Sequence, residues 1–174
     1  GNFHAAYPLG QVILSDPSVP LRIRMQAFNP MIPGDAEDSG IPIAVLRFLV
    51  HNPTDRKMDA SIVASVANCL GDELEDVDGI KQTNEKREME DFAGMIMTAS
   101  GIPAGSPARG TMAMAADARE ALVRRCPSWR GRKRPVFLER LWTNLRDTGW
   151  PDMDSRESEN PAMALTARRA IPPE

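Results

Sequence analysis

Few side chains in this sequence could carry out nucleophilic catalysis. Such a site needs a Ser or Cys nucleophile beside a His base that an acid orients, and the 174-residue chain has two histidines, His4 and His51. His51 precedes Asn52-Pro53, a turn dipeptide beside which a structural histidine is the ordinary finding. The sequence has no Gly-Xaa-Ser-Xaa-Gly motif, no phosphate-binding loop and no metal-binding spacing of His and Cys. We therefore predict that this segment contributes no catalytic residue, no metal ligand and no cofactor site.

The acidic stretch 72–78 is the nearest approach to a calcium-binding pattern. With Leu74 as the first position of a twelve-residue EF-hand loop, the later ligand and glycine positions fall on Asp76, Asp78, Gly79 and Glu85. The first position should be a carboxylate and is Leu, and neither flank has the pattern of an amphipathic helix. A solvated acidic loop is the favoured interpretation. The 24 acidic residues leave open a pair of catalytic carboxylates.

A basic cluster lies later in the chain. Basic residues mixed with aromatic ones are typical of grooves that bind single-stranded nucleic acid, but the whole chain has a net charge of −3 and no nucleic-acid-binding motif. We favour pairing of these residues with the acidic loop, or docking against a further domain, and we expect no nucleic-acid partner. The cluster consists of Arg124, Arg125, Arg130, Arg132, Lys133, Arg134 and Arg140, with Trp129 and Trp142.

Composition indicates a folded globular chain made of many short elements. Hydrophobic residues make up 42% and charged residues 26%, which is incompatible with wholesale disorder. Fifteen prolines and twelve glycines are dispersed along the chain, which favours short strands joined by turns. No apolar run approaches the roughly 20 residues of a membrane-spanning helix. Cys69 and Cys126 allow either one bridge or two free thiols, so the compartment stays undecided.

The first two predicted strands form a hairpin within residues 9–29. Residues 21–27 alternate between apolar and polar side chains, which is typical of a half-buried strand, and Pro20 and Pro30 bracket them. A shorter strand is predicted at residues 11–14, with a turn at residues 15–18.

Further strands are predicted at 43–50 and 58–69. The first is almost entirely apolar, which favours burial on both faces. Because a short polar turn separates the two, we predict that they pair with each other as antiparallel neighbours. Residues 72–91 are charged and are predicted to be an exposed loop. Strands return at 94–100 and 110–116.

One segment has a helical pattern. After Pro135, the apolar residues Phe137, Leu138, Leu141, Trp142 and Leu145 fall on one stripe, which predicts an amphipathic helix over residues 135–147 that packs on the sheet. A last strand is predicted at 162–170. With five to six strands, the sequence predicts a mainly β fold, an antiparallel β-sandwich of the supersandwich kind with one helix, occupying residues 1–174 as a single domain or fragment that is incomplete at both ends.

Several turn and strand segments resemble the N-terminal domain of glycoside hydrolase family 116, which includes bacterial β-glucosidases and the non-lysosomal (bile acid) glucosylceramidases. The most specific part is the turn Phe28-Asn29-Pro30-Met31-Ile32-Pro33-Gly34-Asp35, followed by Ile41-Pro42-Ile43. Residues before each proline are restricted to extended conformations, so this turn is expected to be rigid and suited to line a groove or touch a neighbour. The similar segments are residues 7–10, 16–21, 27–35, 39–45, 52–55, 68–71 and, more loosely, 110–113 and the tryptophan-bearing helix.

The resemblance implies a non-catalytic β-sandwich that precedes a helical (α/α)6 catalytic domain outside this chain. In the family, the nucleophile Glu and the acid/base Asp belong to that helical domain, and no residue here matches either one. The implied partners are the helical domain of the same polypeptide and a β-glucoside or glucosyl lipid substrate. Residues 72–91 and 124–134 depart from the family pattern. The alternative is a free-standing carbohydrate- or protein-binding β module; a chain that stops at Pro172-Pro173-Glu174 without a closing strand favours the enzyme fragment.

Overall fold

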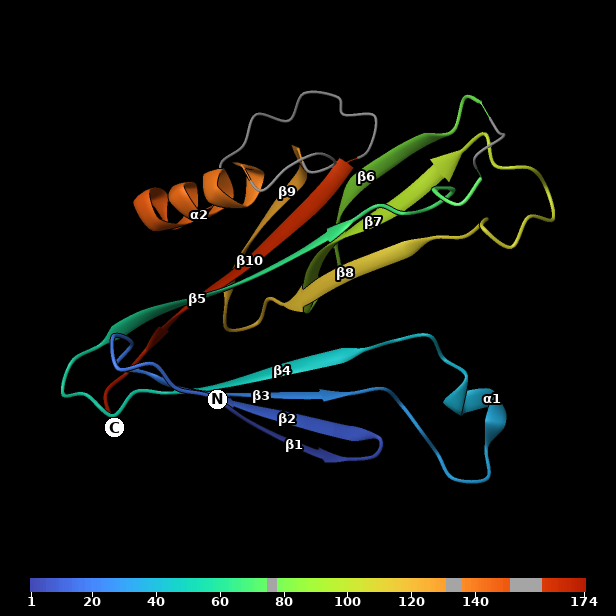
Figure 1. The fold of residues 1–174 in the computed structure, drawn as a ribbon. Helices are drawn as coiled ribbons and strands as arrows, with labels where there is room; N and C mark the ends of the chain where they lie inside the picture. The colour runs from blue at the N-terminus through green and yellow to red at the C-terminus, as the bar shows by residue number, and fades with distance from the viewer. Residues whose placement is uncertain (75–77, 131–135, 151–160) are drawn as a thin grey trace. The chain divides into compact units, whose positions relative to one another are not determined.

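The computed structural model is built mainly of antiparallel β-strands, which confirms the predicted fold class. It describes residues 1–74, 78–130, 136–150 and 161–174, and contains ten strands and two helices in the order β1–β3, α1, β4–β9, α2, β10 (Figure 1). The chain divides into two compact units. Unit 1 comprises Gly1–Ala60 and Ala170–Glu174, and unit 2 comprises Ser61–Arg169. Within the described ranges, no helix is long and apolar enough to cross a membrane.

Unit 1 contains a four-stranded sheet in the order β1-β2-β3-β4. Its strands are β1 (Asn2–Ala6), β2 (Leu9–Leu14), β3 (Arg22–Phe28) and β4 (Val45–His51). β2 and β3 pair as antiparallel neighbours, with Leu9 opposite Phe28, so the predicted hairpin is confirmed. Its turn is held by Asp16, whose Oδ1 accepts hydrogen bonds from the Ser18 amide at 2.8 Å and the Ser18 hydroxyl at 2.6 Å.

The register of unit 1 gives its sheet two different faces. Directly paired residues share a face, and the pairings Phe3–Val12, Val12–Met25 and Met25–Phe48 run across all four strands on one side. We call this side the apolar face. It consists of Phe3, Ala5, Gly10, Val12, Leu14, Ile23, Met25, Ala27, Leu46, Phe48 and Val50. The opposite face mixes apolar side chains with arginines and histidines.

Two predictions about residues 43–69 are wrong. β4 is not buried on both faces, because Leu46 and Leu49 are exposed. It does not pair with the next strand either: β4 pairs with β3, whereas β5 (Met58–Ala67) joins a three-stranded sheet in the order β5-β10-β9. The partners of β5 therefore come from much later in the sequence. The predicted alternation of β5 is confirmed, since Met58, Ala60, Ile62, Ala64 and Val66 are all half-buried.

Unit 2 packs two sheets face to face as a β-sandwich. One sheet has the order β5-β10-β9, where β9 is Leu122–Arg130 and β10 is Pro161–Ile171. The other has the order β6-β7-β8, with β6 at Lys81–Glu88, β7 at Phe92–Ser100 and β8 at Met112–Asp117. Met95 and Met97 of β7 meet Met163 and Leu165 of β10 in a buried cluster. Around it pack Val66, Met112, Met114, Ala116 and Val123.

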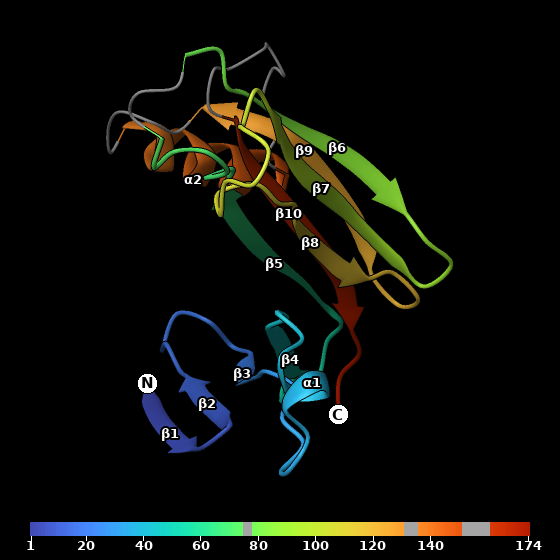
Figure 2. The ribbon, with the colours of Figure 1, turned by 90° about the vertical axis from the view of Figure 1, so that its right-hand side faces the viewer.

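Helix α2 (Val136–Thr148) covers the other face of the β9–β10 pair (Figures 1 and 2). Leu141 is buried against Cys126, Ala162 and Ala164, and Leu145 packs beside them. The predicted helix is thus confirmed. The prediction that Trp142 belongs to its packed stripe is wrong, because this side chain is 68% exposed. The side chains of Phe137 and Leu138 lie outside the described residues.

The prediction of a loop over residues 72–91 is wrong for its second half. Lys81–Glu88 forms β6, which pairs with β7 in antiparallel register, Lys81 opposite Ser100. The polar side chains that suggested a loop are satisfied by hydrogen bonds: Gln82 Nε2 donates to Leu70 O at 3.0 Å, and Asn84 Nδ2 to Pro127 O at 2.7 Å. Strands β1 and β9 and the one-turn helix α1 (Ala36–Ser39) were not predicted either. The strands predicted at 94–100, 110–116 and 162–170 are present.

Candidate functional site

The turn after β3, which the sequence singled out, is closed by its own side chains. Asp35 is the N-cap of α1, and its Oδ1 accepts hydrogen bonds from the amides of Glu37 at 3.1 Å and Asp38 at 2.9 Å. Carboxylates are favoured at this position because they satisfy amides that have no partner inside the helix. The Asp35 carboxylate therefore has a structural role in this turn.

A second contact ties the two ends of the turn together. The Ser39 hydroxyl accepts a hydrogen bond from the Ile32 amide at 2.9 Å and donates one to the Ile32 carbonyl at 3.1 Å. Gly34 has φ 88°, a backbone conformation that favours glycine. With its polar groups used internally, the turn presents apolar side chains: Ile32 and Ile41 are each 50% exposed. It offers a contact surface rather than reactive groups.

Asp16 and Asp117 have pKa values below the ordinary value, because hydrogen bonds stabilise their ionised carboxylates. Hydrogen bonds from the Arg119 side chain, and then from its amide, lower the pKa of Asp117 from 3.8 to about 2. The same ion pair raises the pKa of Arg119. Hydrogen bonds from the Ser18 hydroxyl and then its amide lower the pKa of Asp16. A general acid in glycoside hydrolysis needs a raised pKa, so neither carboxyl group is suited to that role.

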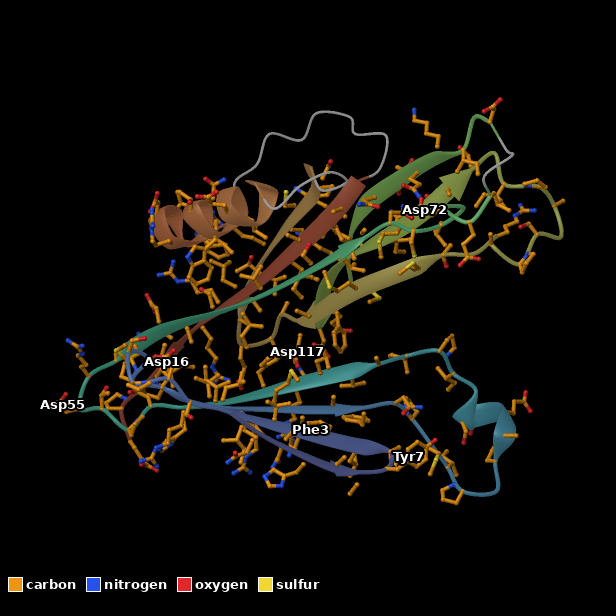
Figure 3. The ribbon with its side chains drawn as sticks, in the orientation of Figure 1. Phe3, Tyr7, Asp16, Asp55, Asp72 and Asp117 are labelled. Carbon is orange, nitrogen blue, oxygen red and sulfur yellow. The ribbon has the colours of Figure 1, made fainter. Side chains whose placement is uncertain are left out.

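Other carboxylates of unit 2 are engaged in ion pairs or hydrogen bonds. Glu88 pairs with Arg125, Glu120 lies 2.5 Å from Arg169, and Glu85 lies 3.0 Å from Arg87. Asp72 accepts a hydrogen bond from Gln82 Nε2 at 2.8 Å. Figure 3 shows Asp72 and Asp117 at separate positions of unit 2, on the loop after β5 and at the end of β8.

The calcium-binding alternative gains no support. Glu85, which would close the EF-hand loop, lies in strand β6 and pairs with Arg87, and no helix flanks this segment on either side within residues 58–74 and 78–100. Asp76 lies outside the described residues. Across residues 1–74, 78–130, 136–150 and 161–174, no group of three or more His, Cys, Asp and Glu side chains could hold a metal ion.

The two histidines and the two cysteines have side chains that commonly serve as nucleophiles, bases and metal ligands. His4 lies on the exposed strand β1, and Nε2 of His51 is 3.3 Å from Glu174 Oε2. Neither cysteine forms a disulfide: Cys69 is exposed, with its Sγ 3.5 Å from Met112 Sδ, and Cys126 is buried. The choice that the sequence left open, one bridge or two thiols, is therefore resolved in favour of thiols.

The basic cluster is divided between the faces of β9. Successive strand residues point to opposite sides of a sheet, and accordingly the guanidinium of Arg124 lies over the ring of buried Trp150, 3.8 Å from its centroid, while that of Arg125 pairs with Glu88. Arg168 is 5.9 Å from the same ring. Glu88 lies in β6 and not in the acidic stretch 72–78, so the predicted pairing of the basic cluster with that stretch stays a prediction. Residues 132–134 and the side chains of Trp129, Arg130 and Arg140 lie outside the described residues.

A model of a known protein family matches the whole chain. The family model described as "beta-glucosidase 2, glycosyl-hydrolase family 116 N-term" matches residues 1–174, the whole chain. The chain belongs to glycosyl hydrolase family 116. This confirms the resemblance seen in the turn at residues 28–35 and its neighbouring segments, and assigns the chain to the N-terminal domain of that family.

Within this family 116 domain, sequence reasoning missed two features of the candidate surfaces. One feature is Trp150, which was not singled out. It follows Gly149, the residue with φ 72° directly after α2, and it is buried under the guanidinium of Arg124. The other feature is the exposed isoleucines of the 28–43 segment, Ile32, Ile41 and Ile43, which were counted as strand or turn residues and lie between β3 and β4, 48–50% exposed.

Proposed function

We propose that this family 116 domain is a non-catalytic part of a retaining β-glucosidase, in which a helical (α/α)6 domain of the same polypeptide performs the hydrolysis. The family match over residues 1–174 is the observation that carries the proposal. Two acidic residues with structural roles support it: Asp35 is the N-cap of α1, and Asp117 is held by Arg119 with a lowered pKa. We propose β-glucosides, including glucosyl lipids such as glucosylceramide, as the substrates of this parent enzyme.

Two assays test this proposal. The purified chain should release no nitrophenol from 4-nitrophenyl β-glucoside, whereas the parent enzyme should do so. Turnover by the chain alone that disappears on replacement of one of its own acids would contradict a supporting role. Deleting residues 1–174 from the parent enzyme should abolish soluble, active protein; retention of full activity and melting temperature would also contradict it. Comparing the aryl glucoside with glucosylceramide in the parent enzyme tests the lipid substrate separately.

A binding module is the second candidate, and the exposed Trp142 is the observation that favours it. Its indole stands out from α2 and is 68% exposed. Amphipathic aromatic rings of this kind are common at binding surfaces. Calorimetric titration of the chain with gluco-oligosaccharides, in parallel with Trp142→Ala, tests this candidate. Saturable binding that the substitution removes would favour the module; absence of heat with both proteins would leave the supporting role as the account.

A further inference from the structure

The turn that leads into β6 contains two adjacent residues whose own atoms can react with each other. Asp78 is followed by Gly79, and no other aspartate or asparagine of the sequence precedes a glycine. A glycine has no Cβ, so its amide nitrogen is less hindered than that of any other residue towards the side chain that precedes it. The carboxyl group of Asp78 is therefore the one in this chain that the following amide attacks most easily.

The surroundings of the two residues leave this reaction unobstructed. Asp78 and Gly79 are exposed and lie in a turn, outside any strand or helix. Nothing lies within 4 Å of a Cβ built on Gly79, whose φ is 83°. Among residues 1–74, 78–130, 136–150 and 161–174, the Asp78 carboxylate has no hydrogen-bond or ion-pair partner. Asp72 differs, because its carboxylate accepts a hydrogen bond from Gln82 Nε2 at 2.8 Å.

The dipeptide Asp38-Ser39 provides a contrast within the same chain. Asp38 is also exposed and a small residue follows it, but the Ser39 amide donates to the Asp35 carbonyl at 3.2 Å in α1. An amide in such a bond turns towards the preceding side chain only when the helix opens locally. The Gly79 amide makes no backbone hydrogen bond to another described residue. The two dipeptides therefore differ in the freedom of the nitrogen that would react.

We propose that Asp78-Gly79 is a site of spontaneous isoaspartate formation, a covalent modification of the backbone. The Gly79 amide nitrogen loses its proton and bonds to Cγ of Asp78, the carboxyl oxygen leaves as water, and a cyclic succinimide results. Water then adds to either ring carbonyl. Addition at Cγ restores aspartate, and addition at the main-chain carbonyl gives isoaspartate, whose main chain runs through Cγ. The water lost in the first step returns in the second, so the reaction is an isomerisation that needs no oxidant, cofactor or partner.

The modification affects the start of β6. Isoaspartate lengthens the main chain by a methylene group just before Ile80 and Lys81, the first residue of the strand. This junction is tightly packed: a Cβ built on Gly101 would lie 2.7 Å from the Gly79 carbonyl oxygen, and one built on Gly71 would lie 3.1 Å from the Ile80 side chain. The added group therefore displaces backbone that other segments hold in place, and we expect it to loosen the first residues of β6.

Ageing of the intact protein in neutral buffer at physiological temperature tests the inference. Peptide-resolved mass spectrometry with electron-transfer fragmentation quantifies isoaspartate at each position, and methyl transfer by isoaspartyl methyltransferase checks the total. Asp78 should isomerise within about 10-fold of its rate in a synthetic peptide of residues 74–83, and at least about 10-fold faster than Asp38. Asp78→Glu should remove the signal at this position, because glutamate would have to form a larger ring. Asp38→Glu, the matched control, should leave that signal unchanged.

A smaller difference between Asp78 and Asp38 would overturn the inference. So would a rate at Asp78 more than about 10-fold below that of the peptide, because the fold would then hold the amide away from the carboxyl group. Hydrogen exchange on the separated isomerised and unmodified fractions tests the effect on β6. The amides of residues 81–84 should exchange about 10-fold faster in the isomerised fraction, and those of β8 equally in both. Equal exchange at residues 81–84 would contradict the loosening of β6.

Discussion

The guanidinium of Arg119 holds the carboxylate of Asp117 at the end of β8. Nε of Arg119 lies 3.0 Å from Oδ1 and 3.1 Å from Oδ2, Nη2 also donates to Oδ2, and the Arg119 amide donates to Oδ1 at 3.0 Å. One residue thus supplies both a charged and a backbone donor to the same acid. Such hydrogen bonds favour the ionised form of a carboxyl group.

The Asp117 pair makes a prediction about pH. Because the pKa of Asp117 in the folded chain is about 2, below its ordinary value of 3.8, the ion pair stabilises the fold above about pH 4 and this contribution is lost as the pH falls towards 2. A carboxyl-carbon NMR titration should give a midpoint near 2. Arg119→Gln should move the midpoint up towards 3.8, whereas Arg87→Gln should leave it in place. An unchanged midpoint in Arg119→Gln would show that the pair is absent in solution.

Substitutions at two adjacent positions distinguish the packed side of α2 from its exposed side. Leu141→Asp should lower the free energy of unfolding by about 3 kcal/mol or more, because it places an unpaired charge against Cys126 and Ala164. Trp142→Asp, at the next position of the same helix, should change it by no more than about 0.5 kcal/mol. Urea unfolding followed by circular dichroism measures both. Equal losses for the two variants would mean that the helix packs in another orientation.

Gly94 lies where β7 and β8 approach each other closely. A Cβ at this position would be 2.5 Å from the Met114 carbonyl oxygen and 2.7 Å from the Ala115 Cβ. Gly94→Ala should therefore destabilise the chain by about 1–3 kcal/mol, as other overpacked substitutions do. Gly110→Ala is the control, because nothing lies within 4 Å of its added Cβ. The difference between the two melting temperatures reports the effect, and a Gly94→Ala protein as stable as the control would contradict this strand spacing.

Thr166 of β10 is fully buried, and among the residues that the structure describes its hydroxyl has no hydrogen-bond partner. A buried polar group without a partner is destabilising. Thr166→Val keeps the shape and removes the hydroxyl, so it should raise the free energy of unfolding by about 1 kcal/mol. Thr166→Ser keeps the hydroxyl, loses a methyl group and should lower stability. A loss of stability in Thr166→Val would indicate that the hydroxyl has a partner in solution.

Local patterns in the sequence were sufficient where the physical cause is local. The β2–β3 hairpin follows from alternation between two prolines, and α2 from a stripe of apolar residues. β6 was not predicted because its polar side chains look like those of a loop. Gln82 donates to Leu70 O and Asp72, and Asn84 donates to Pro127 O and accepts from Asn68, and these partners come from other segments. The amide of Asn68, which donates to Thr98 O at 3.0 Å, is a similar case.

Pairing between distant strands was beyond local reasoning. A polar turn between β4 and β5 suggested a hairpin, yet β5 lies beside β10, and Ser65 Oγ donates to Met163 O at 2.8 Å across 98 positions of sequence. For the candidate surfaces, the residue types of the apolar face were visible as alternation in β3, but their common face required the register of four strands. The absence of a catalytic residue in this segment stays a prediction.

β10 lies near the end of the given sequence, at Pro161–Ile171, and this position affects folding during synthesis on the ribosome. The four strands β1–β4 can pair once residue 51 has emerged. The backbone groups of β5 that pair with β10 have no partner strand until β10 has been synthesised. Non-local pairings of this kind slow folding and leave strands open to wrong partners in the meantime. The hydrogen bond from the Asn52 side chain to the Ile171 carbonyl, 3.1 Å long, also forms only after residue 171 has been synthesised. The nascent chain therefore exposes an unpaired β5 until residues 161–171 have been synthesised, which is the kind of species that aggregates most readily.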